Sequence, residues 1–268
     1  MNIFKRIWSW LTSDPLPHAR LAALAEVPTP PYDPRPAAKR NLEDVRKRFA
    51  GDITEHTMKV LHEDGLYRHV RFSKPGSMMY HFDLITWPGY LTIQGDMGGY
   101  TFRRDNDMFR FFASGKDINP QYWGEKLQNG AESGTRSVRT YNRELVEEYV
   151  KDAYDDWVAE HEVPVHEVEI GLTDQSELDA WLADAEKVWK ELEREILWDP
   201  METEQDAHEA LRAFEGSTSF SLYDTWEWDL TDYDYHFLWC CFAIQWGVHK
   251  FHEAEALKAG VQMGAFGA

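Results

Sequence analysis

Residues 82–102, with the sequence FDLITWPGYLTIQGDMGGYTF, decide the fold class of this chain. Apolar and polar residues alternate in three short runs, which the pair Pro88-Gly89 and the glycine-rich segment 95–99 separate. Alternation with period two is typical of half-buried strands, and tight turns rich in glycine join antiparallel neighbours. The stretch therefore predicts an antiparallel meander. Segment 95–99 is expected to be a hairpin turn and not a phosphate cradle, because it carries Asp96 and no lysine.

The alternation extends upstream of this stretch. The runs 66–72 and 78–84 both show it, so we expect about four strands. A helix over about 38–49 precedes the strands. After them, Asp105 or Asn106 is expected to cap a short helix.

Beyond residue 143 the apolar period changes to 3.6, which predicts helices. Asp174 followed by Glu177 resembles a capping box at the start of one of them. A meander with packed helices, followed by an acidic and mainly helical second half, is an α+β fold. The expected elements of this half are helices over about 144–160, 174–197, 203–214 and 233–259, and a strand over 220–230.

Four segments follow from these patterns, and we expect the two large ones to pack as one unit. Residues 1–37 form an N-terminal arm and a proline-rich linker, and the arm docks either on the body or on a partner. Residues 38–128 form the meander lobe, 129–141 form a loop, and 142–268 form the acidic helical lobe.

Charge is distributed very unevenly along the chain. Residues 1–143 hold 21 Lys or Arg and 16 Asp or Glu, a net charge of +5, whereas residues 144–268 hold 7 and 31, a net charge of −24. Such asymmetry indicates a charged partner. It also argues against direct nucleic-acid binding, so we expect no appreciable affinity for duplex DNA at physiological salt.

Two further patterns bear on the surroundings of the chain. The longest apolar run, 237–248, is shorter than the roughly 20 residues of a bilayer-spanning helix, so we expect no transmembrane span. Cys240 and Cys241 are adjacent within that run, which predicts two buried thiols in a reducing compartment.

No motif for metal, cofactor or nucleophilic chemistry stands out, so we expect no cofactor and no catalytic residue. His81, Asp83 and Asp96 form one weak candidate metal site, because histidine and carboxylate side chains ligate metals and the first two alternate onto one strand face. His249 and His252, three apart on a helix, form another. We expect neither to hold a tightly bound metal.

Two other groups of residues resemble functional sites, and for each we favour a structural role over a functional one. Glycosidases use two carboxylates held at a set separation across a pocket, and Asp155-Asp156 is one of several carboxylate pairs in this sequence. A chain with 47 acidic residues contains such pairs by chance, so we assign this one no catalytic role. Arg103, Arg104 and Arg110 lie near aromatic residues, a pattern that can bind a nucleic-acid backbone.

The acidic half gives the strongest functional signal. In the helix over 144–160 the acids fall opposite the apolar stripe, and in 224–234 they alternate with Trp and Tyr. One reading is a solvated surface that confers solubility. The other is an interface, in which aromatic anchors and complementary charge bind a basic protein. On the second reading the partner-binding residues are Asp152, Asp155, Asp156, Glu160, Asp224, Trp226, Glu227, Trp228, Asp229, Asp232 and Asp234.

Two blocks resemble a family of uncharacterised proteins of tailed bacteriophages and prophages. The first block runs from 82 to 123 and includes FDLITWPGY and NPQYW, and the second is YHFLWCCFAI at 235–244. No activity is assigned to the family, so no residue role is carried over from it. The resemblance implies a phage accessory protein that works in the host cytoplasm.

Together these observations lead to one functional hypothesis and two alternatives. We expect a non-enzymatic protein that binds and blocks a host protein, such as a nucleic-acid-handling defence enzyme, through its acidic, aromatic-rich surface. A metal-assisted hydrolase is the first alternative, and a virion or assembly component is the second. Homo-oligomerisation stays open.

Overall fold

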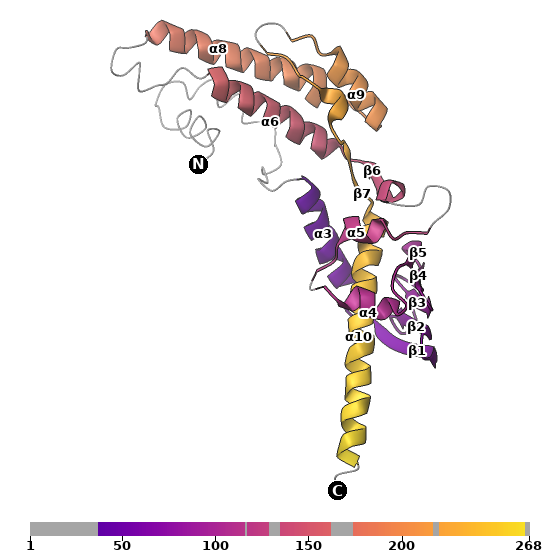
Figure 1. The fold of residues 1–268 in the computed structure, drawn as a ribbon. Coiled ribbons are helices and arrows are strands. Elements are labelled where there is room, and N and C mark those ends of the chain that lie inside the picture. The colour runs from indigo at the N-terminus through magenta and orange to yellow at the C-terminus, as the bar shows by residue number, and fades with distance from the viewer. Residues whose placement is uncertain (1–36, 116, 129–134, 162–173, 217–219, 266–268) are drawn as a thin grey trace. The chain divides into compact units, whose positions relative to one another are not determined.

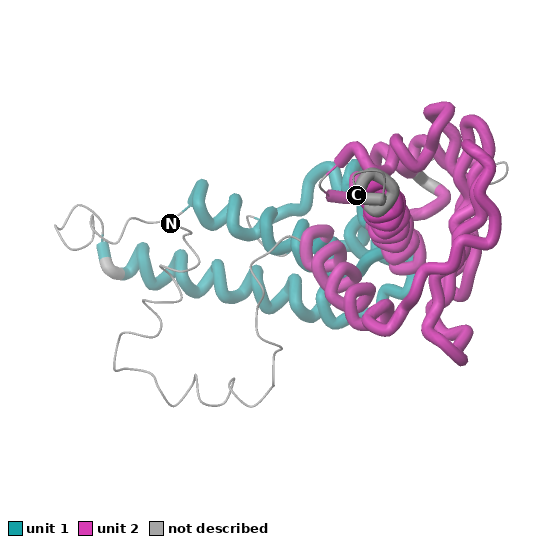
Figure 2. The backbone as a smooth tube through the Cα atoms, turned by 90° about the horizontal axis from the view of Figure 1, so that it is seen from below, with its two compact units in different colours: residues 1–37, 141–231 teal, residues 38–140, 232–268 magenta. Residues whose placement is uncertain are grey.

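The computed structural model describes residues 37–115, 117–128, 135–161, 174–216 and 220–265, and the expected N-terminal arm lies outside them. The chain divides into two compact units (Figure 2). The sheet unit comprises residues 38–140 and 232–268, and the helical unit comprises residues 1–37 and 141–231. This division corrects the expected acidic lobe over 142–268, because residues 232–268 belong with the meander.

The sheet unit contains the predicted meander, so the α+β class is confirmed (Figure 1). Five antiparallel strands follow one another in the order of the sequence, where about four were expected. The hairpin turn between β4 and β5 lies where the glycine-rich segment predicted it. The strands are β1 (Thr57–Asp64), β2 (Tyr67–Ser73), β3 (Phe82–Trp87), β4 (Tyr90–Gly95) and β5 (Gly98–Arg103).

The apolar face of the sheet packs against the long helix α10 (Tyr235–Ala265), with α3 (Ala37–Asp52) beside that helix (Figure 1). Gly247 marks the close approach, because a Cβ atom there would lie 2.9 Å from Leu84 Cδ1 and 3.0 Å from Phe72 Cε2. Every residue from 237 to 244 is buried. The apolar centre of the last helix is therefore fully buried between the sheet and its neighbours.

Shorter elements complete the sheet unit. The helix α4 (Met108–Ala113) is capped by Asp107, whose side chain accepts a hydrogen bond from the Phe109 amide, and not by the expected Asp105 or Asn106. The helix α5 (Pro120–Gly124) and the 3-10 helix η1 (Thr135–Val138) follow. The chain passes between the units in β6 (Arg139–Tyr141) and again in β7 (Thr231–Tyr233), which pair as a two-stranded sheet.

The helical unit contains the predicted helices at closely similar positions. The first is α6 (Arg143–His161), followed by α8 (Gln175–Leu192), which continues into the π-helix η2 (Glu193–Leu197), and then by α9 (Glu204–Ala213). Apolar side chains of all three pack into a core of their own. The Tyr154 hydroxyl donates to the Ala185 carbonyl at 3.0 Å and so links α6 to α8 within this core.

Two local expectations for this unit are wrong. Residues 220–230 form no strand, and the 3-10 helix η3 (Thr225–Glu227) interrupts them. Asp174 caps α8 through the Ser176 amide at 3.1 Å. The reciprocal capping box lies instead at α9, where Thr203 and Asp206 exchange hydrogen bonds.

Candidate functional site

The acidic face of α6 consists of Asp152, Asp155, Asp156 and Glu160. Asp155 is half-buried and the other three are exposed, while the opposite side of the helix is buried in the core of the helical unit. The helical period predicted this segregation, and the structure confirms it. Three of the four carboxylates are therefore fully accessible to a partner, and the fourth is accessible in part.

Like charges crowd this face. Partial burial raises the pKa of the Asp152 carboxyl, and the neighbouring charges of Glu148 and Asp156 raise it further. Partial burial also raises the pKa of Asp155, with Asp152 and Asp156 adding to the effect against the opposing influence of Lys151. The folded protein therefore holds negative charge here at a cost in free energy, and a nearby cation would reduce that cost.

We expect Asp152→Asn to stabilise the helical unit by about 0.5 kcal/mol at pH 7, because it removes repulsion from acids four residues away on either side. Since the folded-state pKa is raised, the wild-type chain recovers this stability when Asp152 is protonated at low pH. The gain should therefore disappear below about pH 4. Hydrogen exchange of α6 amides at both pH values measures it, and an equal gain at both would contradict the charge explanation.

The second predicted binding segment, 224–234, is divided by the structure. Its first part lies in the helical unit, where Asp224, Trp226 and Glu227 are exposed. Trp228 is half-buried and stacks on Tyr149 of α6, with ring centroids 5.1 Å apart.

The remaining three acids of the segment have local structural roles. Asp229 is exposed and accepts a hydrogen bond from the Thr231 hydroxyl at 2.7 Å. Asp232 is only 5% exposed and accepts from the Asn41 amide at 2.9 Å. Asp234 caps α10 by accepting from the backbone amides of His236 and Phe237. Asp232 therefore lies outside the accessible acidic surface, which corrects its prediction as a partner-binding residue. Asp234 is half-buried, and its role in partner binding stays a prediction.

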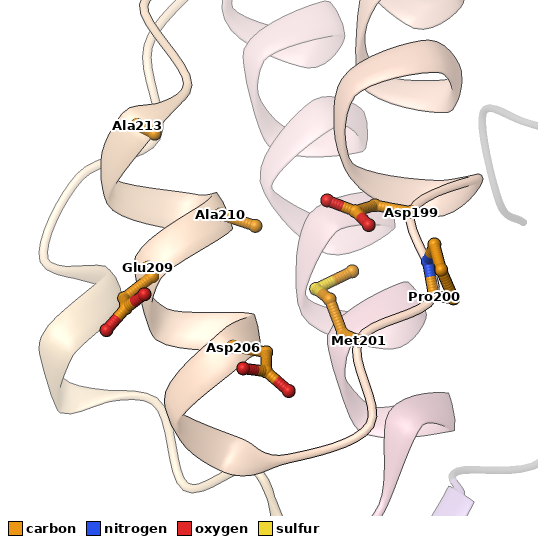
Figure 3. A pocket seen from close by; sticks show the side chains of 7 residues that line it. All are labelled: Asp199, Pro200, Met201, Asp206, Glu209, Ala210 and Ala213. Atoms are coloured by element: carbon orange, nitrogen blue, oxygen red, sulfur yellow. The ribbon is translucent and has the colours of Figure 1, made fainter.

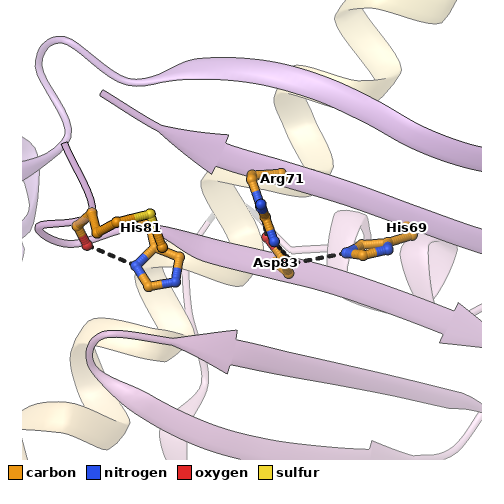
Figure 4. Close-up of polar contacts among 5 residues, drawn as sticks. His69, Arg71, His81 and Asp83 are labelled. Atoms are coloured by element: carbon orange, nitrogen blue, oxygen red, sulfur yellow. Dashed lines mark hydrogen bonds and ion pairs between the residues drawn. The ribbon is translucent and has the colours of Figure 1, made fainter. Parts of the chain in front are cut away.

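The candidate metal site at His81, Asp83 and Asp96 does not assemble. Figure 4 shows Asp83 engaged by Arg71 and His69 instead. Asp83 is held by Arg71 through two hydrogen bonds of 2.8 Å and by His69 Nε2 at 2.8 Å. Burial acts to raise the pKa of Asp83, but the hydrogen bonds from Arg71 and His69 outweigh it, so the pKa is lowered. The nearby His81 ring instead contacts the Met78 carbonyl.

The other candidate ligands lie in the turn between β4 and β5 and on α10. Asp96 accepts a hydrogen bond from the Tyr80 amide at 2.9 Å, and His249 and His252 are exposed on α10. Within the part of the chain that the structure describes, no three His, Cys, Asp or Glu side chains are grouped so that they could hold a metal ion.

Two of the three candidate nucleic-acid residues contact neighbouring side chains, and the third, Arg110, is exposed. The Arg103 guanidinium lies 5.4 Å from the centre of the Tyr90 ring, and Arg104 lies 3.9 Å from the Asp105 carboxylate. The neighbouring Asp107 carboxylate accepts two hydrogen bonds from Arg68. Sequence reasoning missed Arg68, which no local pattern distinguishes from other strand residues.

An open hollow of about 380 Å³ lies between α9 and the segment that follows η2 (Figure 3). Its carboxylates come from Asp199, Asp206 and Glu209. The Asp206 carboxylate already accepts a hydrogen bond from the Thr203 backbone amide in the capping box of α9. No histidine, cysteine, serine or lysine lines the hollow, so its titratable side chains are carboxylates alone.

The predicted burial of the two cysteines is confirmed, while the reducing compartment stays a prediction. Cys240 and Cys241 are buried, and burial raises the pKa of both thiols. No helix within the described ranges is long and apolar enough to cross a membrane.

The comparisons with known proteins identify no relative. No protein-family model matches the sequence, and neither a curated protein nor a solved structure matches it significantly.

Proposed function

We propose that this protein acts by binding, and that the acidic face of α6 engages a basic surface of a host protein. The phage setting and the blocking of a nucleic-acid-handling defence enzyme belong to this proposal. The sequence resemblance supports the first, and the acidic surface supports the second. In this role the protein occupies a surface that otherwise contacts phosphates.

The observation that carries the proposal is the separation of charge between the two units. Residues 141–231, which belong to the helical unit, hold 27 Asp or Glu and only 6 Lys or Arg. The rest of the chain holds 20 acids and 22 bases. The net negative charge of the protein therefore resides in one unit, which is more than a uniformly solvated surface requires.

Electrostatic attraction is the physical basis for recognition. A concentrated charge of one sign raises the rate of encounter with a surface of opposite sign, and salt weakens the effect. Partial burial raises the pKa values of Asp152 and Asp155, and repulsion between neighbouring carboxylates on this face adds to the effect. A basic partner relieves this repulsion when it binds.

The test is a fourfold charge reversal to lysine at Asp152, Asp155, Asp156 and Glu160. We expect association with a partner captured from bacterial lysate to slow by about ten-fold, or roughly 1–2 kcal/mol. The rate is measured by surface plasmon resonance at several salt concentrations. Duplex DNA should compete with the wild-type protein for the captured partner.

The matched control reverses four acids of the sheet unit and so changes the net charge equally. Asp44, Asp64, Asp105 and Glu125 are exposed and serve this purpose. Capture by this control should be close to that of the wild type. If both variants capture the same proteins equally well, or if the wild type captures none, the acidic face is only a solvated surface.

A further inference from the structure

The segment 223–227 is an exposed turn held firmly at both ends. On one side Phe220 is 3% exposed, and its ring lies 5.7 Å from that of Trp157. On the other side Trp228 stacks on Tyr149, and Leu230 is fully buried. The core of the helical unit therefore fixes where this turn emerges.

The turn presents aromatic rings to solvent. Tyr223 is 77% exposed and Trp226 is 73% exposed, although large aromatic side chains are normally well buried. Asp224 between them has the left-handed backbone conformation, with φ 50° and ψ 30°. Aspartate is among the few residues other than glycine that adopt this conformation, and here it gives the turn a defined backbone shape.

We infer that the turn 223–227 is a docking element for arginine side chains of the basic partner, an inference that rests on the proposed function. Exposed Trp and Tyr contribute little to the core of the unit, but they are the side chains that most often dominate binding at protein interfaces. Asp224 and Glu227 flank the rings and are exposed as well. Anchoring rings and complementary charge therefore occur on one short, fixed segment.

The combination favours arginine over lysine. A guanidinium stacks flat on an aromatic ring and also forms two hydrogen bonds with a carboxylate, whereas an ammonium acts as a point charge. The protein already contains this arrangement in its sheet unit. There the Arg68 guanidinium lies 5.0 Å from the Phe109 ring centre and binds Asp107 through two hydrogen bonds.

The test compares a nona-arginine with a nona-lysine peptide in calorimetric titrations of the full chain at physiological ionic strength. We expect the wild type to bind the arginine peptide more tightly. Trp226→Ala should weaken arginine-peptide binding by about three- to five-fold and change lysine-peptide binding by less than two-fold. The double variant Asp224→Asn, Glu227→Gln should weaken both peptides, because it removes charge only.

Trp198→Ala is the matched control, because Trp198 is 74% exposed in the same unit but lies outside the turn. It should leave both affinities unchanged, and melting curves should confirm that every variant folds. If Trp226→Ala has no effect, or if Trp198→Ala has the same effect, the inference is overturned while the proposed function stands. If the wild type binds neither peptide, the proposed function and the inference both fail.

Discussion

Replacing Trp239 with alanine should destabilise the sheet unit by about 3–5 kcal/mol, the usual cost of truncating a fully buried tryptophan. Its ring is 0% exposed and lies within 6.2 Å of the rings of Phe49, Tyr80 and Phe82. Its indole N–H donates to the Asp52 carboxylate at 3.0 Å. The variant therefore leaves a large cavity and an unpaired carboxylate at the junction of helix and sheet.

Hydrogen exchange of amides in β2, β3 and β4 measures this loss without interference from the helical unit. Trp239→Phe is the matched control, since it keeps most of the ring contacts and removes the hydrogen bond to Asp52. We expect it to cost about 1.5–3 kcal/mol, the range for hydrogen bonds to charged groups. A loss below about 1 kcal/mol for the alanine variant would show that Trp239 does not hold α10 on the sheet.

Gly95→Ala is expected to cost about 3 kcal/mol, at the upper end of the range for inserting a methyl group into packed structure. A Cβ atom at Gly95 would overlap the backbone carbonyl oxygen of His81 and lie 2.8 Å from Phe82 Cα. Both obstacles are backbone atoms, so a change of rotamer cannot relieve the clash. The pairing of β3 with β4 must open at this end, and with it the hydrogen bond from the Asp96 amide to His81.

Gly51→Ala is the matched control for this substitution. Gly51 lies in α3, and an added Cβ atom there meets nothing within 4 Å. Alanine is the better helix former, so this variant should stabilise the unit by about 0.5–1 kcal/mol. Urea denaturation followed by far-UV circular dichroism compares the two variants. Equal effects of the two substitutions would contradict the close strand approach at Gly95.

The strands with clear alternation were predictable from sequence, and β1 was not. In β2–β5 one face is buried under helices, so apolar residues had to recur with period two. In β1 the core-facing Met58 and Val60 are only half-buried, and the register shifts between Val60 and His62. An edge strand with a bulge needs fewer apolar residues, and its pattern is correspondingly weak.

The same alternation with period two led to the wrong prediction of a strand over 220–230. Phe220, Leu222, Trp228 and Leu230 alternate because they anchor a turn on the core, and none of them lies in a strand. Period two records which side chains face inward. It does not record whether the backbone has a hydrogen-bonded partner.

The candidate site was predictable only in part, for a similar reason. Acids on a long amphipathic helix must face away from its buried stripe, so the acidic face of α6 follows from spacing alone. For Asp232 spacing fails, because its partner Asn41 is 191 residues away in the sequence. Asp83 likewise became an ion-pair residue through Arg71 and His69 on the neighbouring strand.

The sequence by itself determined the α+β class, the meander, the long helices, the buried cysteines and the side on which the acids of α6 lie. These properties depend on local periodicity, which a single segment carries. Only the tertiary structure decided that α10 belongs with the sheet, that the acids at 232 and 234 serve structural contacts, and that Tyr223 and Trp226 emerge on a fixed turn. These outcomes depend on contacts between segments that are far apart in the sequence. Such contacts form only when the whole core packs, because the interior leaves little free space.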